Sequence, residues 1–262
     1  MTVIVVPDGG YLHPRVRGSR RAWGITLQLY GLRSRRNWGI GDFRDLTDVI
    51  RWAGAELNAD LLGVNPLHAL PPGQVSPYSP SSRLFHHPLY LDLESIHEFQ
   101  EAPSLQAKVK SPAFQARLAS LRRSPKVQYE AIERMKWTTL EALFRVFQRR
   151  HLARKTSRAA VFHRFVREEG KALERFALFR TLEQRMSRRR ESAGSGSHGW
   201  ASWPKAYQHP DSPAVKRVAA RSRSRMQFFQ YVEWQCRQQL DSVQAAAKRA
   251  CMAIGLYKDM AV

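Results

Sequence analysis

Two short apolar segments, separated by one amphipathic segment, constrain the fold of this chain most strongly. The first, "AWGITLQLY" at residues 22–30, alternates as a buried strand does, and the second, "ADLLGVNPLHAL" at residues 59–70, is another short apolar run. Between them, residues 43–57 carry apolar side chains at helical spacing, and Asp42 and Asp45 stand where a helix begins. The order strand, helix, strand predicts a β/α layout with parallel strands.

The rest of the chain extends this layout after a long interruption. Residues 101–190 are mostly helical by the spacing of their apolar side chains, and residues 222–249 predict one more long helix. That helix leads into "CMAIGLYKDMAV", an apolar run that predicts a third buried strand. The segment "RRRESAGSGSHG" at residues 188–199 predicts a flexible or exposed loop.

The positive charge of the chain is concentrated in one segment. The formal net charge is +21, and residues 101–225 carry +19 of it. Such an excess raises the hypothesis of nucleic-acid binding. The aromatic residues of this segment follow helical spacing, which is typical of a core and not of a base-stacking platform. A solvated, Arg-rich helical surface is therefore the favoured interpretation.

Composition argues against several classes of protein, namely membrane-spanning, secreted, disulfide-bonded and cysteine-ligated zinc proteins. No apolar run reaches the roughly 18 residues of a membrane span, and the first residues lack the basic region of a signal peptide. Cys236 and Cys251 have neither zinc spacing nor a disulfide framework. We therefore expect a cytoplasmic protein with buried, reduced thiols and no membrane partner.

The stretch "SPYSPSSRLFHHPLYLD" at residues 76–92 is too rich in proline for a helix interior and predicts a shaped loop that runs into a strand. By itself it is compatible with a surface turn or a polyproline recognition motif. His86 and His87 are adjacent, so on a strand they point to opposite faces and do not predict a metal site. Gly39 and Gly41 lack the third glycine of a dinucleotide-binding loop.

Four segments carry a family resemblance: "WGITLQLYGLRSRRNWGIGDFRDL", "GVNPLHAL", "SPYSPSSRLFHHPLYLDLESI" and "GLYKDMAV". In this order they closely resemble bacterial 4-α-glucanotransferases, the amylomaltases of glycoside hydrolase family 77. The resemblance implies an α/β fold, a TIM-type (β/α)8 barrel with a large, mostly helical insertion, of which this chain holds the first three β/α units. It implies transfer of glycosyl units between α-1,4-glucans by two carboxylates, without a cofactor or metal.

The resemblance also implies which residues bind the sugar. Ser76 and Tyr78 occupy sugar-contact positions of the family, and the ligand face of such a barrel lies at the carboxyl ends of its strands. Asn65 and His68 follow the second strand, and Asp259 ends the third. Each has a structural alternative: Asn65 in an Asn-Pro turn, His68 packed under the loop, and Asp259 paired with an arginine in the barrel mouth.

The same resemblance divides the chain into four parts. Residues 1–20 end an N-terminal β-domain, 21–100 form the first β/α units, 101–225 are the basic helical insertion, and 226–262 return to the barrel. The catalytic Asp, Glu and Asp motifs of the family are absent from the sequence and are expected beyond Val262, so the barrel is incomplete and the isolated chain is expected to be inactive.

Two alternatives stay open beside this interpretation. The chain is either a truncated enzyme or a degenerate, non-catalytic carbohydrate-binding protein, and a basic nucleic-acid-binding protein is disfavoured. A second polypeptide that supplies the remaining strands is compatible with the sequence. Trp23 and Trp38 could stack on glucan, but we expect them in the core.

Overall fold

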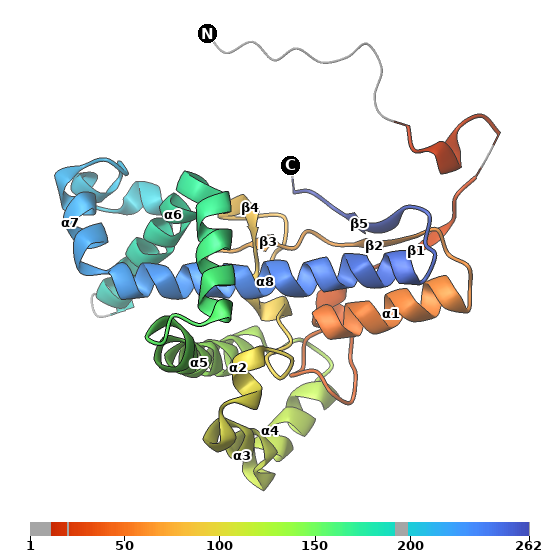
Figure 1. Cartoon of the computed structure of the whole chain (residues 1–262), viewed down its shortest axis with the longest axis horizontal. Helices are drawn as coiled ribbons and strands as arrows, with labels where there is room; N and C mark the ends of the chain where they lie inside the picture. Colours follow the sequence, from red (N-terminus) through yellow and green to blue (C-terminus); the bar gives the residue numbers. More distant parts are fainter. Residues whose placement is uncertain (1–11, 20, 192–198, 262) are drawn as a thin grey trace.

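The fold was analysed in a computed structural model that describes residues 12–19, 21–191 and 199–261. Most of the predicted exposed loop at 188–199, and the first half of the predicted N-terminal part at 1–20, lie outside the described residues. Figure 1 shows the long helix α8 in the middle of the molecule, with the sheet beside its carboxyl-terminal half and helices beside its other half.

The centre of the fold is a parallel sheet of three strands, β1 (Gly24–Leu27), β2 (Leu61–Val64) and β5 (Gly255–Lys258), in the order β1-β2-β5. Helix α1 (Phe43–Ala55) connects the first pair, and α8 (Arg223–Arg249) precedes β5. The three predicted strands and their parallel arrangement are confirmed. The order along the sheet is also the one that three successive β/α units of a barrel have.

The two faces of this sheet differ. In register, Ile25, Leu62 and Leu256 lie side by side and pack on the core, whereas Thr26 and Tyr257 flank Gly63 on the opposite face. That opposite face is open, since Thr26 and Tyr257 are both exposed. The predicted burial of the first and third strands was wrong: β1 spans four residues, of which Ile25 and Leu27 are half-buried and the others exposed, and β5 buries only Gly255.

Helices α1 and α8 pack together over the covered face of the sheet (Figure 1). Their close approach requires Gly54, because a Cβ there would lie 2.7 Å from the Cβ of Ala250 and 2.9 Å from the side chain of Met252. Helix α1 begins with a capping box in which Asp42 accepts from the backbone of Asp45 and Asp45 accepts from that of Asp42. The predicted capping role of these two carboxylates is confirmed.

A second, two-stranded sheet lies against α8. Strand β3 (His68–Ala69) pairs antiparallel with β4 (Ser82–His86), and Glu233 of α8 accepts from the backbone N–H of His86 at 3.0 Å and lies 2.6 Å from its Nδ1. The ring of His87 is buried instead against Tyr90, and burial lowers the pKa of His87 to about 3. The strand predicted after the proline-rich loop exists but ends at His86, and the two adjacent histidines engage different partners.

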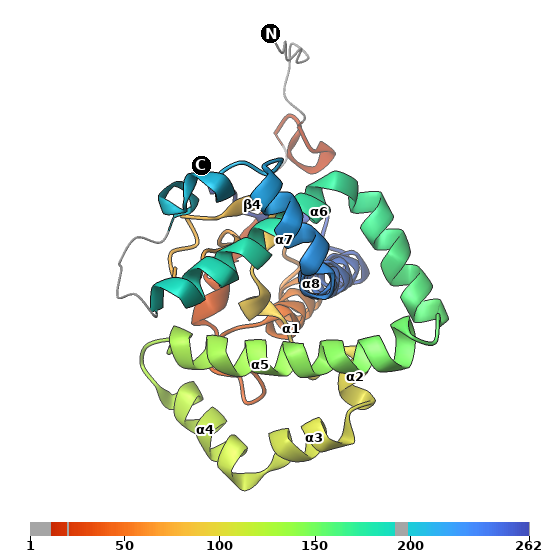
Figure 2. The same cartoon turned by 90° about the vertical axis from the view of Figure 1, so that its left-hand side faces the viewer.

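Helices make up most of the insertion, as predicted. They are α3 (Pro103–Lys110), α4 (Pro112–Arg123), α5 (Tyr129–Phe147), α6 (Ser157–Glu191) and α7 (Pro213–Arg221), and α2 (His97–Gln100) comes just before the predicted boundary. Because α6 continues to Glu191, the predicted start of the loop at residue 188 was wrong. A π-helical turn (Gln148–Leu152) joins α5 to α6, and Gly170 interrupts α6 with a positive φ of 54°. Figure 2 shows α3 and α4 beyond α5, on the side away from α8.

The core between α5, α6 and α8 is aromatic. Phe147 of α5, Phe162 of α6 and Trp234 of α8 pack with ring centroids 5.3–5.6 Å apart. Trp38 also lies in the core, as expected, whereas Trp23 is 47% exposed at the amino end of β1, so its predicted core position was wrong. Cys236 is buried but Cys251 is exposed, and both thiols are free.

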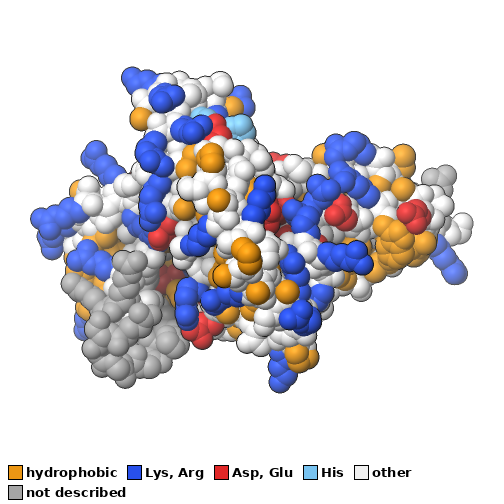
Figure 3. Space-filling view, turned by 90° about the horizontal axis from the view of Figure 1, so that it is seen from below, with side chains coloured by type: hydrophobic (Ala, Val, Ile, Leu, Met, Phe, Trp, Pro, Cys, Tyr) orange, Lys and Arg blue, Asp and Glu red, His pale blue; other side chains and the backbone are white. Residues whose placement is uncertain are grey.

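Lysine and arginine side chains are dispersed over the face in Figure 3, with hydrophobic and acidic side chains between them. Several arginines of the insertion pair with carboxylates, among them Arg158 with Glu98 and Arg225 with Glu141. In the part of the chain that the structure describes, no helix has the length and hydropathy needed to cross a membrane.

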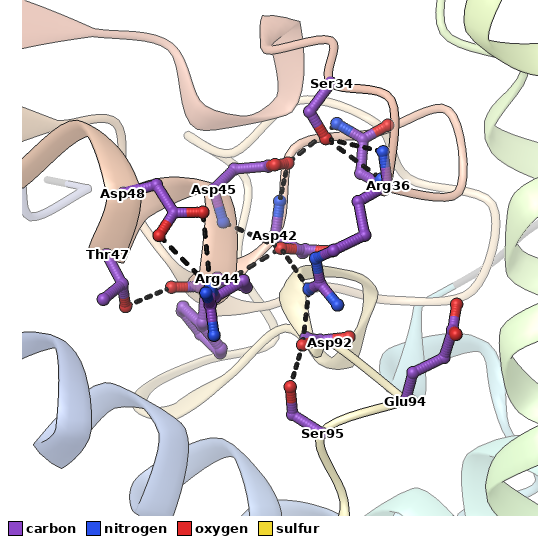
Figure 4. A network of polar contacts seen from close by, with 12 residues as sticks. Ser34, Arg36, Asp42, Arg44, Asp45, Thr47, Asp48, Asp92, Glu94 and Ser95 are labelled. Carbon is purple, nitrogen blue, oxygen red and sulfur yellow. Dashed lines mark hydrogen bonds and ion pairs between the residues drawn. The ribbon is translucent and has the colours of Figure 1, made fainter.

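A buried polar network surrounds the start of α1 (Figure 4). Arg36 pairs with Asp92 at 2.5 Å and lies 4.0 Å from Asp42, and Asn37 donates to Asp45 at 2.7 Å. Burial, together with the neighbouring carboxylates of Asp45 and Asp92, raises the pKa of Asp42 to about 6, although the charge of Lys136 opposes the rise. The protein therefore bears a cost for ionising Asp42 at neutral pH.

This cost predicts a pH dependence of stability. The folded pKa of Asp42 lies above its usual value of 3.8, so its stabilising contribution is complete below pH 4 and is lost as pH rises through 6. Asparagine caps a helix as well as aspartate but does not ionise. Between pH 4 and 7, we expect the unfolding free energy of the wild type to fall relative to that of Asp42→Asn by about 2 kcal/mol. Denaturant titrations across this range measure it, with the exposed Asp48→Asn as control; parallel profiles for the wild type and Asp42→Asn would contradict the assignment.

Candidate binding site at the carboxyl end of the sheet

The carboxyl ends of the three parallel strands meet at one edge. Leu27, Val64 and Lys258 are aligned in register, so the residues that follow them lie at the same level. Asp259, directly after β5, donates its backbone N–H to the carbonyl of Val64 at 3.0 Å. This bond continues the ladder by one residue and holds the backbone of Asp259 at the carboxyl edge of the sheet.

The buried side chain of Asn65, directly after β2, connects the chain segments that follow β1 and β2. It is buried; its Oδ1 accepts from the N–H of Leu29 at 2.8 Å, and its Nδ2 donates to the carbonyl of Pro66 and the hydroxyl of Tyr90 at 2.8 and 3.0 Å. The amide thus ties the end of β1 to the end of β2. A ligand could reach it only by replacing these bonds, so its arrangement fits a positioning role.

The proline-rich loop between β3 and β4 is held at both ends. Ser81 donates its N–H and its hydroxyl to the carbonyl of Ala69, at 2.8 and 3.1 Å. On the other side, the buried Arg180 of α6 donates to the carbonyl of Leu70 at 2.8 Å and pairs with Glu183. The loop is therefore fixed before any ligand binds, which lowers the entropic cost of binding.

Within this loop, Ser76 opens a β-turn with Pro77 in its second position. The N–H of Ser79 donates to the carbonyl of Ser76 at 3.3 Å, and proline at the second position presets the backbone. Pro77 is buried, Ser76 is half-buried, and Tyr78 is 53% exposed. The turn consequently buries its proline and presents the tyrosine ring to solvent.

Tyr78 and Asp259, predicted separately, are in contact. The Tyr78 hydroxyl donates to Asp259 Oδ2 at 3.2 Å, across 181 residues of sequence. Desolvation, together with the bond to this carboxylate, raises the pKa of Tyr78, so the hydroxyl keeps its proton. Arg83 of β4 reinforces the same junction by donating to the carbonyl of Ala261 at 2.6 Å. The proline-rich loop and the end of β5 thus form one surface.

His68 adds an unpaired polar atom to this region. Its Nε2 is buried without a hydrogen-bond partner in the described part of the chain. Burial lowers the pKa of His68, as do the charges of His86, Arg83 and Lys258, while Asp259 opposes them. The ring is therefore neutral at physiological pH, and its free nitrogen can accept from or donate to a hydroxyl group.

The site offers a flat exposed ring, a carboxylate, a neutral imidazole and a half-buried hydroxyl. These groups suit a polyhydroxylated ligand, because a ring can lie against its C–H faces while the polar groups exchange hydrogen bonds with its hydroxyls. Sequence reasoning missed Arg83 and Tyr257. Strand alternation was the available signal for Tyr257, because it places this ring opposite Leu256.

A family model described as 4-alpha-glucanotransferase matches residues 27–262. The 4-alpha-glucanotransferase of Haemophilus influenzae is 37% identical over 253 residues, which are 95% of this chain and 36% of that protein. The Mycobacterium tuberculosis 4-alpha-glucanotransferase is 34% identical over 99% of this chain and 34% of its own length. The chain thus spans about a third of the length of these relatives.

Solved structures agree with the sequence comparison. The amylomaltase of Corynebacterium glutamicum superimposes with a TM-score of 0.67 at 31% identity, over 92% of this chain and 30% of that one. The amylomaltase of Streptococcus agalactiae, solved in complex with acarbose, gives the same TM-score at 19% identity, over 92% of this chain and 43% of that one, which supports the fold alone.

Proposed function

This chain belongs to the 4-alpha-glucanotransferase family, glycoside hydrolase family 77, and from that premise we propose that it forms part of an enzyme that transfers glucosyl units between α-1,4-glucans. The observation that carries the proposal to particular residues is the contact between Tyr78 and Asp259 at the carboxyl edge of the sheet. In barrels, this edge is where ligands bind.

In the proposed site, the exposed ring of Tyr78 stacks on one glucose unit. Asp259 holds the ring in place through the hydroxyl and offers its second oxygen to a sugar hydroxyl. Ser76 supplies a further hydrogen bond, the buried Nε2 of His68 becomes available only if the loop above it moves, and Asn65 positions the strand ends beneath them. The ligand is a malto-oligosaccharide.

Bond cleavage is assigned to other carboxylates. A retaining mechanism needs a nucleophile and an acid/base about 5–5.5 Å apart. Three carboxylates considered in the sequence have other tasks, since Asp42 and Asp45 cap α1 and Asp259 bonds Tyr78. We propose that the catalytic Asp, Glu and Asp come from other barrel strands, and that residues 1–262 alone are inactive.

The open face of the sheet supports this arrangement. Tyr257 is 58% exposed, Met260 64% and Leu84 70%, so large apolar side chains near the site lie open to solvent. In a complete barrel this face points inward and packs on the opposite strands. We propose that the remaining strands, from the same or a second polypeptide, cover it.

The direct test is to incubate the intact gene product with maltotriose and to separate the products by chain length. We expect both longer and shorter saccharides, because disproportionation conserves glycosidic bonds while redistributing glucose units. Residues 1–262, assayed in parallel, should leave maltotriose unchanged. Unchanged maltotriose with the intact protein as well would contradict the enzyme and favour a degenerate carbohydrate-binding protein.

A further inference from the structure

A cluster of two histidines and one glutamate lies in the helical part of the chain, formed by His97, Glu101 and His151. One ligand atom from each residue lies within 4.8 Å of the others. The Nε2 of His151 is 2.9 Å from one carboxylate oxygen of Glu101, and the Nε2 of His97 is 3.5 Å from the other. We propose that these three side chains bind Zn²⁺.

The short helix α2 and a π-helical turn bring the three side chains together. His97 starts α2 and Glu101 follows its last residue, so the two side chains are four residues apart and share one side of the turn. His151 lies fifty residues later in the π-helical turn Gln148–Leu152. Such turns are rare and occur often at functional sites, because the extra residue redirects the side chains.

The orientation of His151 is fixed by a hydrogen bond behind it. Its side chain is 9% exposed, and its Nδ1 lies 3.0 Å from the hydroxyl of Thr156. A partner on Nδ1 leaves Nε2 facing Glu101, which is how metal-binding histidines are commonly held. His97, by contrast, has a side chain that is 54% exposed, with its ring 5.7 Å from the ring of His151.

The local charge also favours a cation. Fully buried Glu98 lies behind the cluster, with one carboxylate oxygen 4.0 Å from the Nε2 of His151. Arg158 pairs with Glu98 through two nitrogens, and the hydroxyl of Tyr231 donates to it at 2.8 Å. One positive charge therefore balances one of the two carboxylates, and Glu101 is left to balance a metal ion.

Two imidazole nitrogens and one carboxylate oxygen are ligands that Zn²⁺ accepts, whereas Mg²⁺ and Ca²⁺ prefer oxygen alone. Zn–N bonds of about 2.0–2.1 Å in a tetrahedral arrangement place the ligand atoms about 3.3 Å apart. The cluster needs only a small movement of His97 to reach this spacing. His97 also lines a cavity of about 350 Å³, from which water can occupy the fourth position.

Bound Zn²⁺ would cross-link α2, which lies next to the barrel units, to the π-helical turn that joins α5 to α6. The metal site takes no part in the proposed sugar chemistry, so a test of Zn²⁺ binding does not depend on whether the proposed function is correct. Because the metal binds the folded state, it should raise the melting temperature in proportion to its occupancy.

The test is a calorimetric titration of untagged protein with Zn²⁺, in parallel with His97→Ala and with His163→Ala, another exposed histidine on α6. We expect one equivalent of Zn²⁺ to bind the wild type and the control alike, and binding at least about tenfold weaker in His97→Ala. The melting temperature should rise with Zn²⁺ and not with Mg²⁺, and Co²⁺ should give the visible absorption of a low-coordinate site.

Two outcomes would overturn the proposal. One is the absence of saturable Zn²⁺ binding in the wild type. The other is equal affinity in the wild type and His97→Ala. In either case Glu101 merely bridges two histidines, and His97→Ala should change the melting temperature equally with and without Zn²⁺.

Discussion

Replacing Lys136 with methionine is expected to lower the free energy of unfolding by about 3–5 kcal/mol. Lys136 of α5 is 1% exposed, and its Nζ donates to the carbonyls of Leu89 and Leu91 at 2.6 and 2.8 Å. Methionine fills the space but donates nothing, so both buried carbonyls lose a partner. The nearby carboxylates of Asp42 and Asp92 also lose a compensating charge.

Lys136 is therefore the polar link between the helical insertion and the segment after β4. Burial lowers the pKa of Lys136, and the three carboxylates of the network at α1 oppose this effect and favour its charged form. Urea titration measures the loss, with the exposed Lys110→Met of α3 as a matched control expected to stay within about 0.5 kcal/mol of the wild type. A loss in Lys136→Met as small as that of the control would show that this link contributes little.

Replacing Tyr78 with alanine is expected to lower kcat/KM for maltotriose by about 10- to 100-fold in the intact gene product. The exposed ring provides the apolar surface on which glucose stacks, and burial of a large apolar side chain contributes about 1.5–3 kcal/mol. Each 1.4 kcal/mol of transition-state binding is worth about tenfold in rate. The melting temperature should barely change, because the ring is largely exposed.

Tyr78→Phe separates the ring from its hydroxyl. It keeps the stacking surface and loses only the hydrogen bond to Asp259, worth about 1 kcal/mol, so we expect about a fivefold loss. Initial rates at several maltotriose concentrations measure both variants. A loss in Tyr78→Phe as large as that in Tyr78→Ala would assign the effect to the hydroxyl and not to the ring.

The strands and helices of this fold were predictable because their signals are local. The apolar runs of β2 and β5 and the spacing along α8 gave their places within a few residues, and Asp42 marked the start of α1. The pairing of β3 with β4 was not predicted. Strand β3 has only two residues, and a long proline-rich loop separates it from β4. The sequence therefore lacks the short turn that usually predicts a hairpin.

The buried lysine shows a second kind of limit. Lys136 falls between Ile132 and Leu140 on the apolar side of α5, where the helical spacing alone predicts a core position. Its charge argued against burial, since an unpaired lysine is rarely buried. Only the tertiary structure reveals that backbone carbonyls from a distant segment accept hydrogen bonds from its ammonium group.

The candidate site was predictable as a set of residues but not as a geometry. The resemblance to the family picked out Ser76 and Tyr78, whereas Asn65, His68 and Asp259 were picked out because they lie at or after the ends of predicted strands. The bond between Tyr78 and Asp259 depends on how a loop folds over an edge 181 residues away, which no local pattern encodes. The burial of Asn65 could not be predicted from the sequence either, and it favours a role in positioning the strand ends over direct contact with a sugar.

The most direct test of the proposed site is the affinity of maltoheptaose for the intact gene product and for the variants Tyr78→Ala and Trp52→Ala, measured calorimetrically. Trp52 is an exposed aromatic residue on α1 that is not among the site residues, and it serves as control. We predict that Tyr78→Ala weakens binding by about tenfold or more while Trp52→Ala binds as the wild type does. Equal affinity of Tyr78→Ala and the wild type would contradict the assignment of this surface to glucan binding.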